Sequence, residues 1–443
     1  MRKRMMIAVA LLAPVTAAAQ IPETSARALG MGSAYTLLAE GFEAAEWNPA
    51  VLAASHRPGF SIGLPAGSME FGSNSWGFSD FRRYSGRALS DADKQALLDM
   101  VDTTLVVRGI VGVAPLGLSI GPFALSVSTA ASTEAGLGRD AVELALFGNA
   151  SRSGAGQYFT AAGSGARGWS ATTIAGSFAM PVSTPLGRLA LGVTGKKIFG
   201  HGLGLARETS SQLQVNPQFA ATAAGHAIYT AYPDSFSVEG PGDLLGGTGT
   251  PGSGFALDVG GVLELAGRRL TIGAVLVNVI GGMSWDEGRL RYERSAQAVT
   301  QQPDGTVIDS DQHLTLDGAA IDGDPVARGL KDSLMARSDF SRLARVGVTM
   351  SLGGITLAGD AQVRLSRGLD EQPQQVVRAG AEYVLLGFLP LRAGIGSDFA
   401  ETLMLSAGSG LHLGPVHLDV GVANLSGSDH PGVRVAAGLG LIF

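Results

Sequence analysis

The sequence predicts an all-β fold, a transmembrane antiparallel β-barrel of about fourteen strands with a plug in its lumen. First, the chain ends at Phe443 in an alternating apolar stretch, residues 432–443. Second, 16% of the residues are charged, fewer than the roughly 25% of soluble proteins. Third, no apolar run after the N-terminus reaches the roughly 18 residues of a membrane helix. Alternating strands are therefore the remaining way for this chain to cross a bilayer.

The N-terminus has the three parts of a secretory signal peptide. Arg2, Lys3 and Arg4 are basic, residues 5–13 are apolar, and residues 17–19 are three alanines before Gln20. We expect residues 1–19 to be cleaved as a signal peptide. Together with the C-terminal strand, this pattern predicts the outer membrane of a Gram-negative bacterium.

Residues 20–56 precede the first expected strand and are predicted to form the plug. The segment is rich in glycine and alanine, residues 34–45 look helical, and Asn48, Pro49 and Ala50 follow, where the proline stops a helix. A segment in front of the first strand of a barrel lies either in the periplasm or in the lumen.

The stretches RALGMGSAY and AEGFEAAEWNPAVLA resemble the N-terminal plug (hatch) of the FadL-type long-chain fatty-acid transporters and their PorV-like relatives. The resemblance implies a fourteen-stranded barrel, a lumenal plug, and passive movement of small hydrophobic molecules through the lumen or through a gap in the wall. Only Asn48, Pro49 and Ala50 carry over from the family, as plug residues.

Tight turns divide residues 57–443, the expected barrel domain. Six pairs of alternating runs are joined by short links that contain glycine or proline, at residues 121–122, 185–188, 266–268, 353–354, 387–390 and 414–415. These six hairpins supply twelve strands. A first strand at about residues 59–64 and the closing strand make fourteen, and the short turns belong on the periplasmic side.

Alternation also predicts which side chains face the lumen. Val346, Val348 and Met350 share one face of their strand, and charged residues occupy the opposite face of its neighbour. Because a charge on the lipid face costs roughly 2–4 kcal/mol for Arg or Lys, the polar face must be the lumen. We expect the inward-facing charges to brace the lumen; they are Asp258, Glu264, Asp360, Arg364, Arg378, Glu382, His417 and Asp419.

Three long connections, residues 131–169, 200–252 and 281–341, are expected outside the cell. A helix is expected at residues 89–102, where Ser90 is followed three residues later by Asp93. Its side of the membrane is open, because a strand at residues 71–78 would place it in the periplasm and change the strand count.

No catalytic, cofactor or metal site is predicted. The run from Gly117 to Gly121 fits G-x-S-x-G, but it leads into a hairpin and not into the strand-to-helix turn that exposes a nucleophilic serine. Asp309, Asp311, Asp322 and Asp324 do not complete a calcium-loop pattern. The chain has no cysteine, and its net charge of −6 argues against nucleic acid as a partner.

The predicted function is non-enzymatic transport of small hydrophobic molecules, fatty-acid-like or aromatic, by passive diffusion across the outer membrane. The alternative is a barrel that does not transport and acts as a docking scaffold for secreted or surface-attached proteins. The expected partners are outer-membrane lipid and lipopolysaccharide, a small hydrophobic ligand, and the barrel assembly machinery, which would read Phe443 as an assembly signal.

Overall fold

The structure is a computed structural model that describes residues 24–55, 57–148, 158–185, 187–214, 220–231, 249–265, 269–302, 304–370, 372–399, 402–427 and 431–443. The expected signal peptide, residues 1–19, lies outside the described residues, as do residues 266–268 of one predicted turn. Among the described residues, no helix has both the length and the apolar character needed to cross a membrane.

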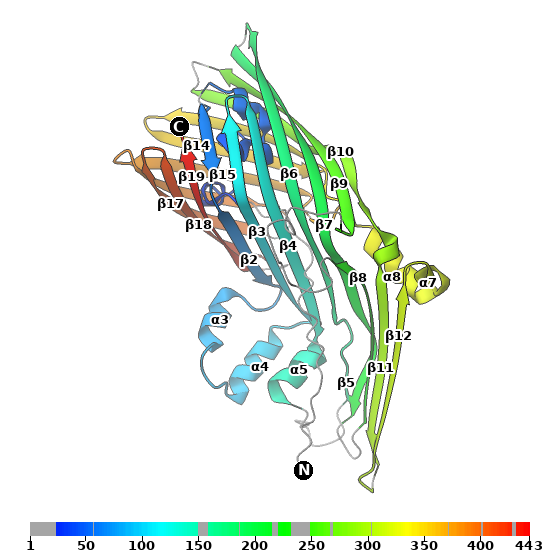
Figure 1. Ribbon diagram of the computed structural model, residues 1–443. Coiled ribbons are helices and arrows are strands. Elements are labelled where there is room, and N and C mark those ends of the chain that lie inside the picture. Colours follow the sequence, from blue (N-terminus) through cyan, green and yellow to red (C-terminus); the bar gives the residue numbers. More distant parts are fainter. Residues whose placement is uncertain are drawn as a thin grey trace.

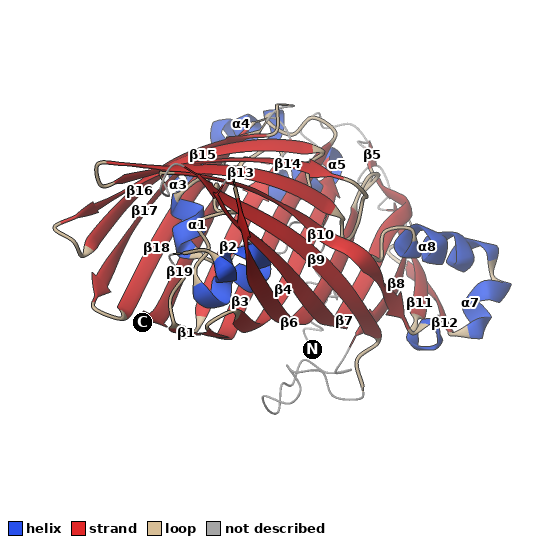
Figure 2. Ribbon diagram, turned by 90° about the horizontal axis from the view of Figure 1, so that it is seen from above, coloured by secondary structure: helices blue, strands red, loops and turns tan. Residues whose placement is uncertain are grey.

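The wall of the molecule is a closed ring of fourteen antiparallel strands (Figures 1 and 2). In order around the ring they are β1 (Phe60–Gly63) with β2 (Ala66–Ser73) as one interrupted strand, β3 (Thr104–Ile120), β4 (Phe123–Gly138), β6 (Gly165–Thr184), β7 (Gly187–Gln214), β9 (Gly252–Leu265), β10 (Leu270–Trp285), β13 (Leu343–Leu352), β14 (Ile355–Arg364), β15 (Gln375–Leu385), β16 (Leu389–Ser397), β17 (Leu403–Leu413), β18 (Val416–Ser426) and β19 (Gly432–Ile442). The predicted strand number and the six hairpins are confirmed.

The closing strand β19 pairs with the first strand as predicted. Ile442 lies opposite Ser61 on β1, and Gly432 lies opposite Gly72 on β2. The first strand is longer than the predicted residues 59–64, because it resumes at Ala66 after an interruption at Leu64 and Pro65 and keeps the same neighbours. The expectation of a short first strand was therefore wrong, while the strand count is unaffected.

Turn chemistry fixes one rim of the barrel. Gly353 and Gly354, between β13 and β14, have φ values of 56° and 91°, the left-handed conformation that a two-residue hairpin turn requires at both positions. All the short hairpins lie at this rim, and the long connections lie at the opposite one.

The helices after β2 settle the question that the sequence left open. α3 (Phe78–Tyr84) and α4 (Asp91–Asp99) follow β2, and Ser90 caps α4 together with Asp93 as predicted. Because β2 ends at the rim opposite the tight turns, both helices lie on the side of the long connections. There α4 packs against α5 (Arg139–Phe147), as Figure 1 shows.

Much of the three long connections is strand, where loops had been expected. β4 and β7 run past the rim, and β7 pairs with β8 (Ala220–Ala231), which pairs with β11 (Arg291–Gln301), which pairs with β12 (Val307–Asp317). β5 (Tyr158–Phe159) also adds to β7. η4 (Glu287–Arg289), α7 (Ala319–Gly323) and α8 (Pro325–Met335) complete this extension, and α8 contacts β7 and β8.

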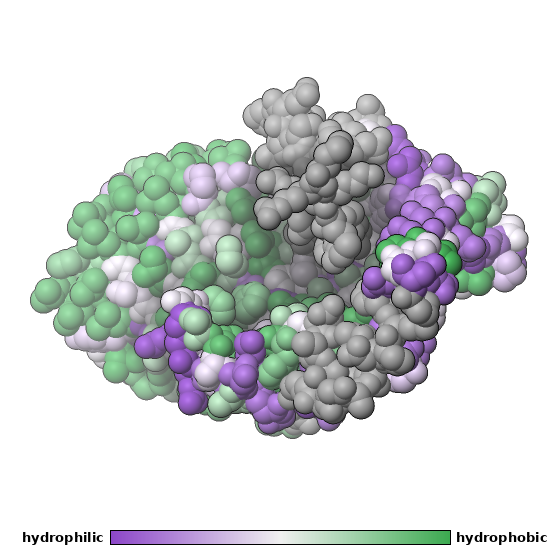
Figure 3. Space-filling view, turned by 90° about the horizontal axis from the view of Figure 1, so that it is seen from below, coloured by the Kyte–Doolittle hydropathy of each residue, from purple (hydrophilic) through white to green (hydrophobic). Residues whose placement is uncertain are grey.

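The outer face of the ring is apolar, as the alternation predicted. Val346, Val348, Leu352 and Val363 are each between 40% and 55% exposed, whereas Asp360 is 4% exposed. Figure 3 shows hydrophobic residues gathered over the barrel and hydrophilic ones over the extension. A closed ring with an apolar exterior satisfies its backbone hydrogen bonds internally and presents a surface suited to lipid.

Residues 24–55, here called the plug, lie inside the ring near the rim of tight turns (Figure 1). The plug comprises α1 (Ala26–Gly30), η1 (Gly41–Glu43), α2 (Ala44–Trp47) and η2 (Pro49–Ala53). The expected helical piece at residues 34–45 is helical only from Gly41 on, in η1 and the start of α2, and the positive φ of Gly41 separates it from the turns before it. Short helical turns let the plug follow the curved inner wall.

Candidate functional site

The Asn48-Pro49-Ala50 motif docks the plug on the wall. The Asn48 side chain accepts a hydrogen bond from the Ala50 N–H at 3.0 Å, and Pro49 occupies the first position of η2, where no N–H is needed. Glycines on the wall make room for the motif. A Cβ on Gly260 would lie 2.0 Å from Asn48 Oδ1, and one on Gly192 would lie 2.4 Å from Ala50 N. Only glycine permits this approach.

Two predicted lumen carboxylates bind the plug. Asp360 accepts hydrogen bonds from the Tyr35 and Thr36 backbone N–H groups at 2.8 and 2.9 Å. Glu264 accepts from the Ser55 N–H at 3.0 Å, where the plug joins the first strand. The structure thus places wall charges at both halves of the plug.

Other predicted charges form a ladder across the lumen. Arg27 on the plug pairs with Glu382 at 2.9 Å, Arg392 pairs with Glu382 at 2.5 Å, and Arg392 pairs with Asp419 at 2.6 Å. His412 lies 3.2 Å from Asp419 and stacks on His417 with ring centroids 3.9 Å apart. The ladder links the plug to four wall strands, β15 to β18.

The remaining predicted residues lie apart from this ladder. Asp258 is 2% exposed and pairs with Lys196 at 2.6 Å. Arg378 donates to Gln362 at 3.3 Å, and Arg364 donates to Gln374 at 3.1 Å. No group of His, Asp and Glu side chains suited to a metal ion occurs in the part of the chain that the structure describes.

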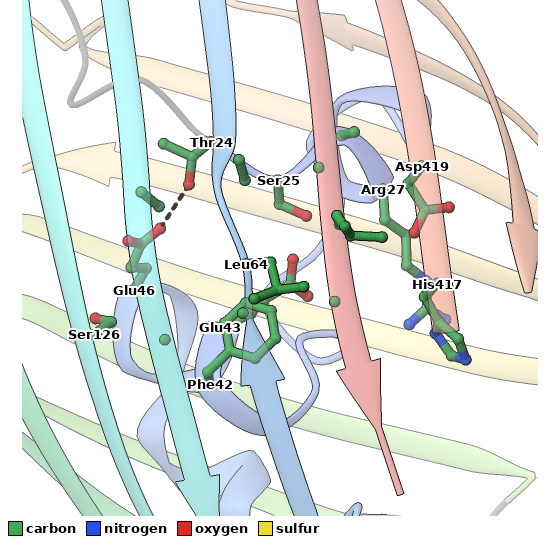
Figure 4. A pocket seen from close by; sticks show the side chains of 18 of the residues that line it. Thr24, Ser25, Arg27, Phe42, Glu43, Glu46, Leu64, Ser126, His417 and Asp419 are labelled. Carbon is green, nitrogen blue, oxygen red and sulfur yellow. Dashed lines mark hydrogen bonds between the residues drawn. The ribbon is translucent and has the colours of Figure 1, made fainter. Parts of the chain in front are cut away.

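A cavity of about 60 Å³ separates the plug from the wall at the first strand (Figure 4). Its ionisable lining comes from Arg27, Glu43, Glu46, His417 and Asp419. Three hydroxyl residues, Thr24, Ser25 and Ser126, also line it, and the rest is apolar or glycine. Figure 4 shows Phe42 and Leu64 near the first strand, and His417 and Asp419 on β18, which is separated from the first strand only by β19.

This cavity coincides with a defect in the wall. The pairing of the first strand with β3 stops at Gly63 and Gly117 and resumes at Ala66 and Ala114, which leaves Pro65 and Pro115 in between. Proline has no N–H, so neither residue can donate to the ladder. The pairing of β3 with β4 also shifts register between Val113 and Leu116.

Residues from both faces of the wall line the cavity. Gly117 is buried on the lumen side, whereas Leu116 is 51% exposed on the outer side, and both border the same space. Beside the two prolines the cavity therefore extends from the lumen to the apolar outer face of the wall.

Phe42 covers the wall beside Pro65 and Pro115 from the lumen side. A Cβ on Gly63 or Gly117 would lie 2.6 or 2.5 Å from the Phe42 ring, so the ring rests directly on the backbone of two adjacent strands. The Phe42 N–H donates to Ser61 Oγ at 3.1 Å, and Ser61 is hydrogen-bonded to Ser119 at 2.7 Å. Ser119, the serine of the G-x-S-x-G run, thus has a structural partner and is 1% exposed.

A second lumen cavity of about 70 Å³ begins on the other side of α2, and it shares Glu46 and Ser126 with the first. Trp47, Val277 and Phe340 form its apolar side, and Arg345, 5.2 Å above the Trp47 ring, forms part of its polar side. Burial, with the nearby Glu43 carboxylate, raises the pKa of Glu46 to about 7. Glu46 therefore lies between the two cavities as a carboxyl that is only partly ionised near neutral pH.

Sequence reasoning missed Phe42, Pro65, Pro115 and Glu46. The two prolines carried a usable signal, since proline inside an alternating run marks an edge or a bulge. Phe42 and Glu46 carried none, because their roles depend on wall residues far away in the sequence.

Comparison with known proteins gives structural neighbours of low sequence identity. The chain is similar to the monoaromatic hydrocarbon channel CymD, with 12% identity, a TM-score of 0.46, and coverage of 95% of this chain and 99% of that one. It is similar to a FadL homologue of Pseudomonas aeruginosa, with 12% identity, a TM-score of 0.46 and coverage of 96% and 100%. It is also similar to the toluene transporter TodX of Pseudomonas putida, with 10% identity, a TM-score of 0.44 and coverage of 97% and 100%.

No curated protein matches the chain. A family model matches residues 49–347, which is more than half of the 443 residues and runs from Pro49 of the plug motif into β13. The chain belongs to that family, described as a family of unknown function (DUF5723).

Proposed function

We propose that the protein lets small hydrophobic molecules cross the outer membrane by passive diffusion, with the plug controlling their passage. The observation that carries this proposal is the cavity at Pro65 and Pro115, which touches both faces of the wall and is closed from inside by Phe42. An apolar molecule that leaves the lumen there would enter lipid without first meeting water.

The described cavity is too small for such a molecule as it stands. It measures about 60 Å³, whereas a cavity of roughly 150 Å³ is known to hold benzene. Passage therefore requires Phe42 to move off Gly63 and Gly117. Because Phe42 belongs to η1, a short turn that begins at Gly41 with a φ of 55°, a small change in the plug backbone can move the ring.

The ion-pair ladder acts on the same segment. Arg27 pairs with Glu40 at 2.9 Å as well as with Glu382, and Glu40 precedes Gly41 and Phe42. Polar cross-bracing of this kind holds the plug in one position, so the closed state is the expected resting state.

The test is uptake of toluene by a bacterial host that lacks its own channel for such compounds. We expect Phe42→Ala to raise uptake severalfold over the wild type, and Asn48→Ala to change it by loosening the plug. Phe123→Ala is the matched control, since Phe123 is 58% exposed on the outer face, packs against Phe178, and does not line the cavity. If the wild type and all three variants took up no more toluene than host cells without the protein, transport would be abandoned.

A docking scaffold is the second candidate. It rests on β12, which pairs only with β11 among the described strands and is exposed along most of its length. An edge strand beyond the rim can add a strand from another chain. Removing residues 291–317 would abolish a scaffold role while leaving toluene uptake intact, which separates the two functions.

A further inference from the structure

We infer that the wall contains a second lateral opening, between β10 and β13, through which an uncharged molecule about the size of one aromatic ring exchanges between the lipid and the lumen cavity beside Trp47. The inference rests on the proposed function and adds the route by which such a molecule reaches the lumen.

The wall is incomplete at this place. β10 pairs with β13 only from Leu270 to Val277, although it continues to Trp285. At Asn278 the φ is 54°, and the ladder with β9 shifts between Leu276 and Ile280. Such a bulge bends the strand and ends its pairing.

Side chains bridge the gap above Val277. Asn278 donates to the Ser341 carbonyl at 2.9 Å, and Trp285 donates to the Ser338 carbonyl at 3.0 Å. Within the described residues, no backbone-to-backbone hydrogen bond joins β10 beyond Val277 to residues 338–342. This part of the wall can separate without breaking a strand ladder.

A cavity of about 160 Å³ occupies the gap and reaches both faces of the wall. Phe255, on the outer face of β9, is 58% exposed, whereas Ile198, on the lumen face of β7, is 3% exposed, and both line the cavity. Its volume is close to the roughly 150 Å³ that holds benzene.

Only a thin partition separates this cavity from the lumen cavity beside Trp47. The two share Ile198, Asn278 and Phe340 as lining residues. Phe340 precedes β13, outside its ladder, and packs edge-on against Trp169 at 5.2 Å. A rotation of the Phe340 side chain would join the two cavities.

The opening lies at the outer edge of the lipid-facing band. A barrel strand crosses the membrane in about 9–11 residues, and β10 begins at Leu270 beside a tight turn. Ile280, 56% exposed, therefore marks the far edge of that band, and Arg342 and Arg367 line the cavity there. This position is nearly opposite Pro65 and Pro115 in the ring. The two openings would therefore be independent lateral routes through the wall.

The test uses the absence of cysteine from the chain. A Cβ on Gly282 would lie 3.2 Å from Asp339 Oδ1, so the pair Gly282→Cys and Asp339→Cys can tie β10 to the bridging segment. The protein is reconstituted in phosphatidylcholine vesicles that carry a toluene-sized aryl diazirine, and labelled residues are mapped by mass spectrometry before and after oxidation.

We expect labelling of Phe340 and Met283 in the reduced protein, at least a fivefold decrease on oxidation, and constant labelling of Val259, which is 45% exposed to lipid. Ser366→Trp, which fills the cavity from a loop, should lower labelling in the same way without a disulfide. Labelling of Val259 without Phe340, or no decrease in either variant, would overturn the inference. Since labelling does not depend on net uptake, the opening can be established even if the transport test fails.

Discussion

Single glycines decide how closely the plug approaches the wall. Gly192 and Gly260 accept the Asn48-Pro49-Ala50 motif, Gly63 and Gly117 accept Phe42, and a Cβ at any of the four would lie within 2.6 Å of a plug atom. Contacts of this kind tolerate no added methyl group unless the backbone shifts. The close fit of the plug against these wall glycines therefore sets its position. The ion pairs of the plug then stabilise that position.

Gly192→Ala should displace the plug. The added methyl group would lie 2.4 Å from Ala50 N, so we expect overpacking to cost about 1–3 kcal/mol and to make residues 24–55 sensitive to protease. Gly195→Ala is the control on the same strand, because a Cβ there meets nothing within 4 Å. Thermal unfolding in detergent and limited proteolysis measure the difference. Equal behaviour of the two variants would contradict the proposed fit.

Glu46 should make the stability of the closed barrel depend on pH. Its pKa is about 7 in the folded protein against 4.5 for the free side chain, so between these values the folded state keeps a proton that the unfolded chain has lost. The stabilisation is complete below about pH 4.5 and is lost as the pH rises through about 7.

The measurement is the unfolding temperature between about pH 5 and about pH 8, with Glu46→Gln beside the wild type. We expect the temperature to fall with rising pH in the wild type and to fall less in Glu46→Gln. Asp91→Asn serves as the control, since the Asp91 side chain is 92% exposed. An unchanged slope in Glu46→Gln would show that another group titrates.

Alternation along each strand was sufficient to predict that Asp258, Asp360 and Glu382 are buried and face inward. It could not show which partner each one has, because partners such as Tyr35 and Arg27 lie more than 300 residues away from Asp360 and Glu382. The contact of Phe42 with two glycines is equally non-local. The sequence therefore predicts which side chains of a strand face the lumen, but it does not predict which residues of the plug or wall they contact.

At the scale of elements, the first strand shows why the prediction stopped short. Pro65 ended the alternating run, and proline inside a run is ordinarily a reason to end a strand. The strand resumes because its apolar and polar alternation continues beyond Pro65, and its pairing with β3 keeps the same register on both sides of Pro65 and Pro115. Each proline by itself indicates the end of a strand. Together, Pro65 and Pro115 produce a short interruption in the pairing of two strands that otherwise continue.

Restoring a donor at both prolines should narrow the defect. In the double variant Pro65→Val and Pro115→Val, each new N–H can complete the ladder, and we expect toluene uptake to fall severalfold with little change in the unfolding temperature. Pro181→Val, on β6 away from the cavity, is the control and should leave uptake unchanged. Uptake equal to that of the wild type in the double variant would place the exit elsewhere.

At the scale of the whole molecule, the ring could be counted from the sequence because hairpin turns are local. Two adjacent residues that readily adopt positive φ, such as Gly353 and Gly354, indicate a hairpin turn independently of the surrounding structure. The sheet of β8, β11 and β12 could not be foreseen, because β11 pairs with β8 across more than sixty residues of chain. Its strands are also polar on both faces in part, which hides the alternation that identified the barrel.

Ring closure yields a final prediction, concerning Phe443. Its backbone pairs with Phe60 at 2.9 Å, while its ring is 60% exposed and lies 5.7 Å from the Phe60 ring. In Phe443→Ala the backbone pairing that closes the ring remains, so the unfolding temperature of purified protein should change little. If the ring is read by the assembly machinery, the fraction of protein in the outer membrane should instead fall severalfold. Fractionation of the expressing cells and thermal unfolding of the purified barrel separate the two effects, because a structural role would lower the unfolding temperature while leaving insertion normal.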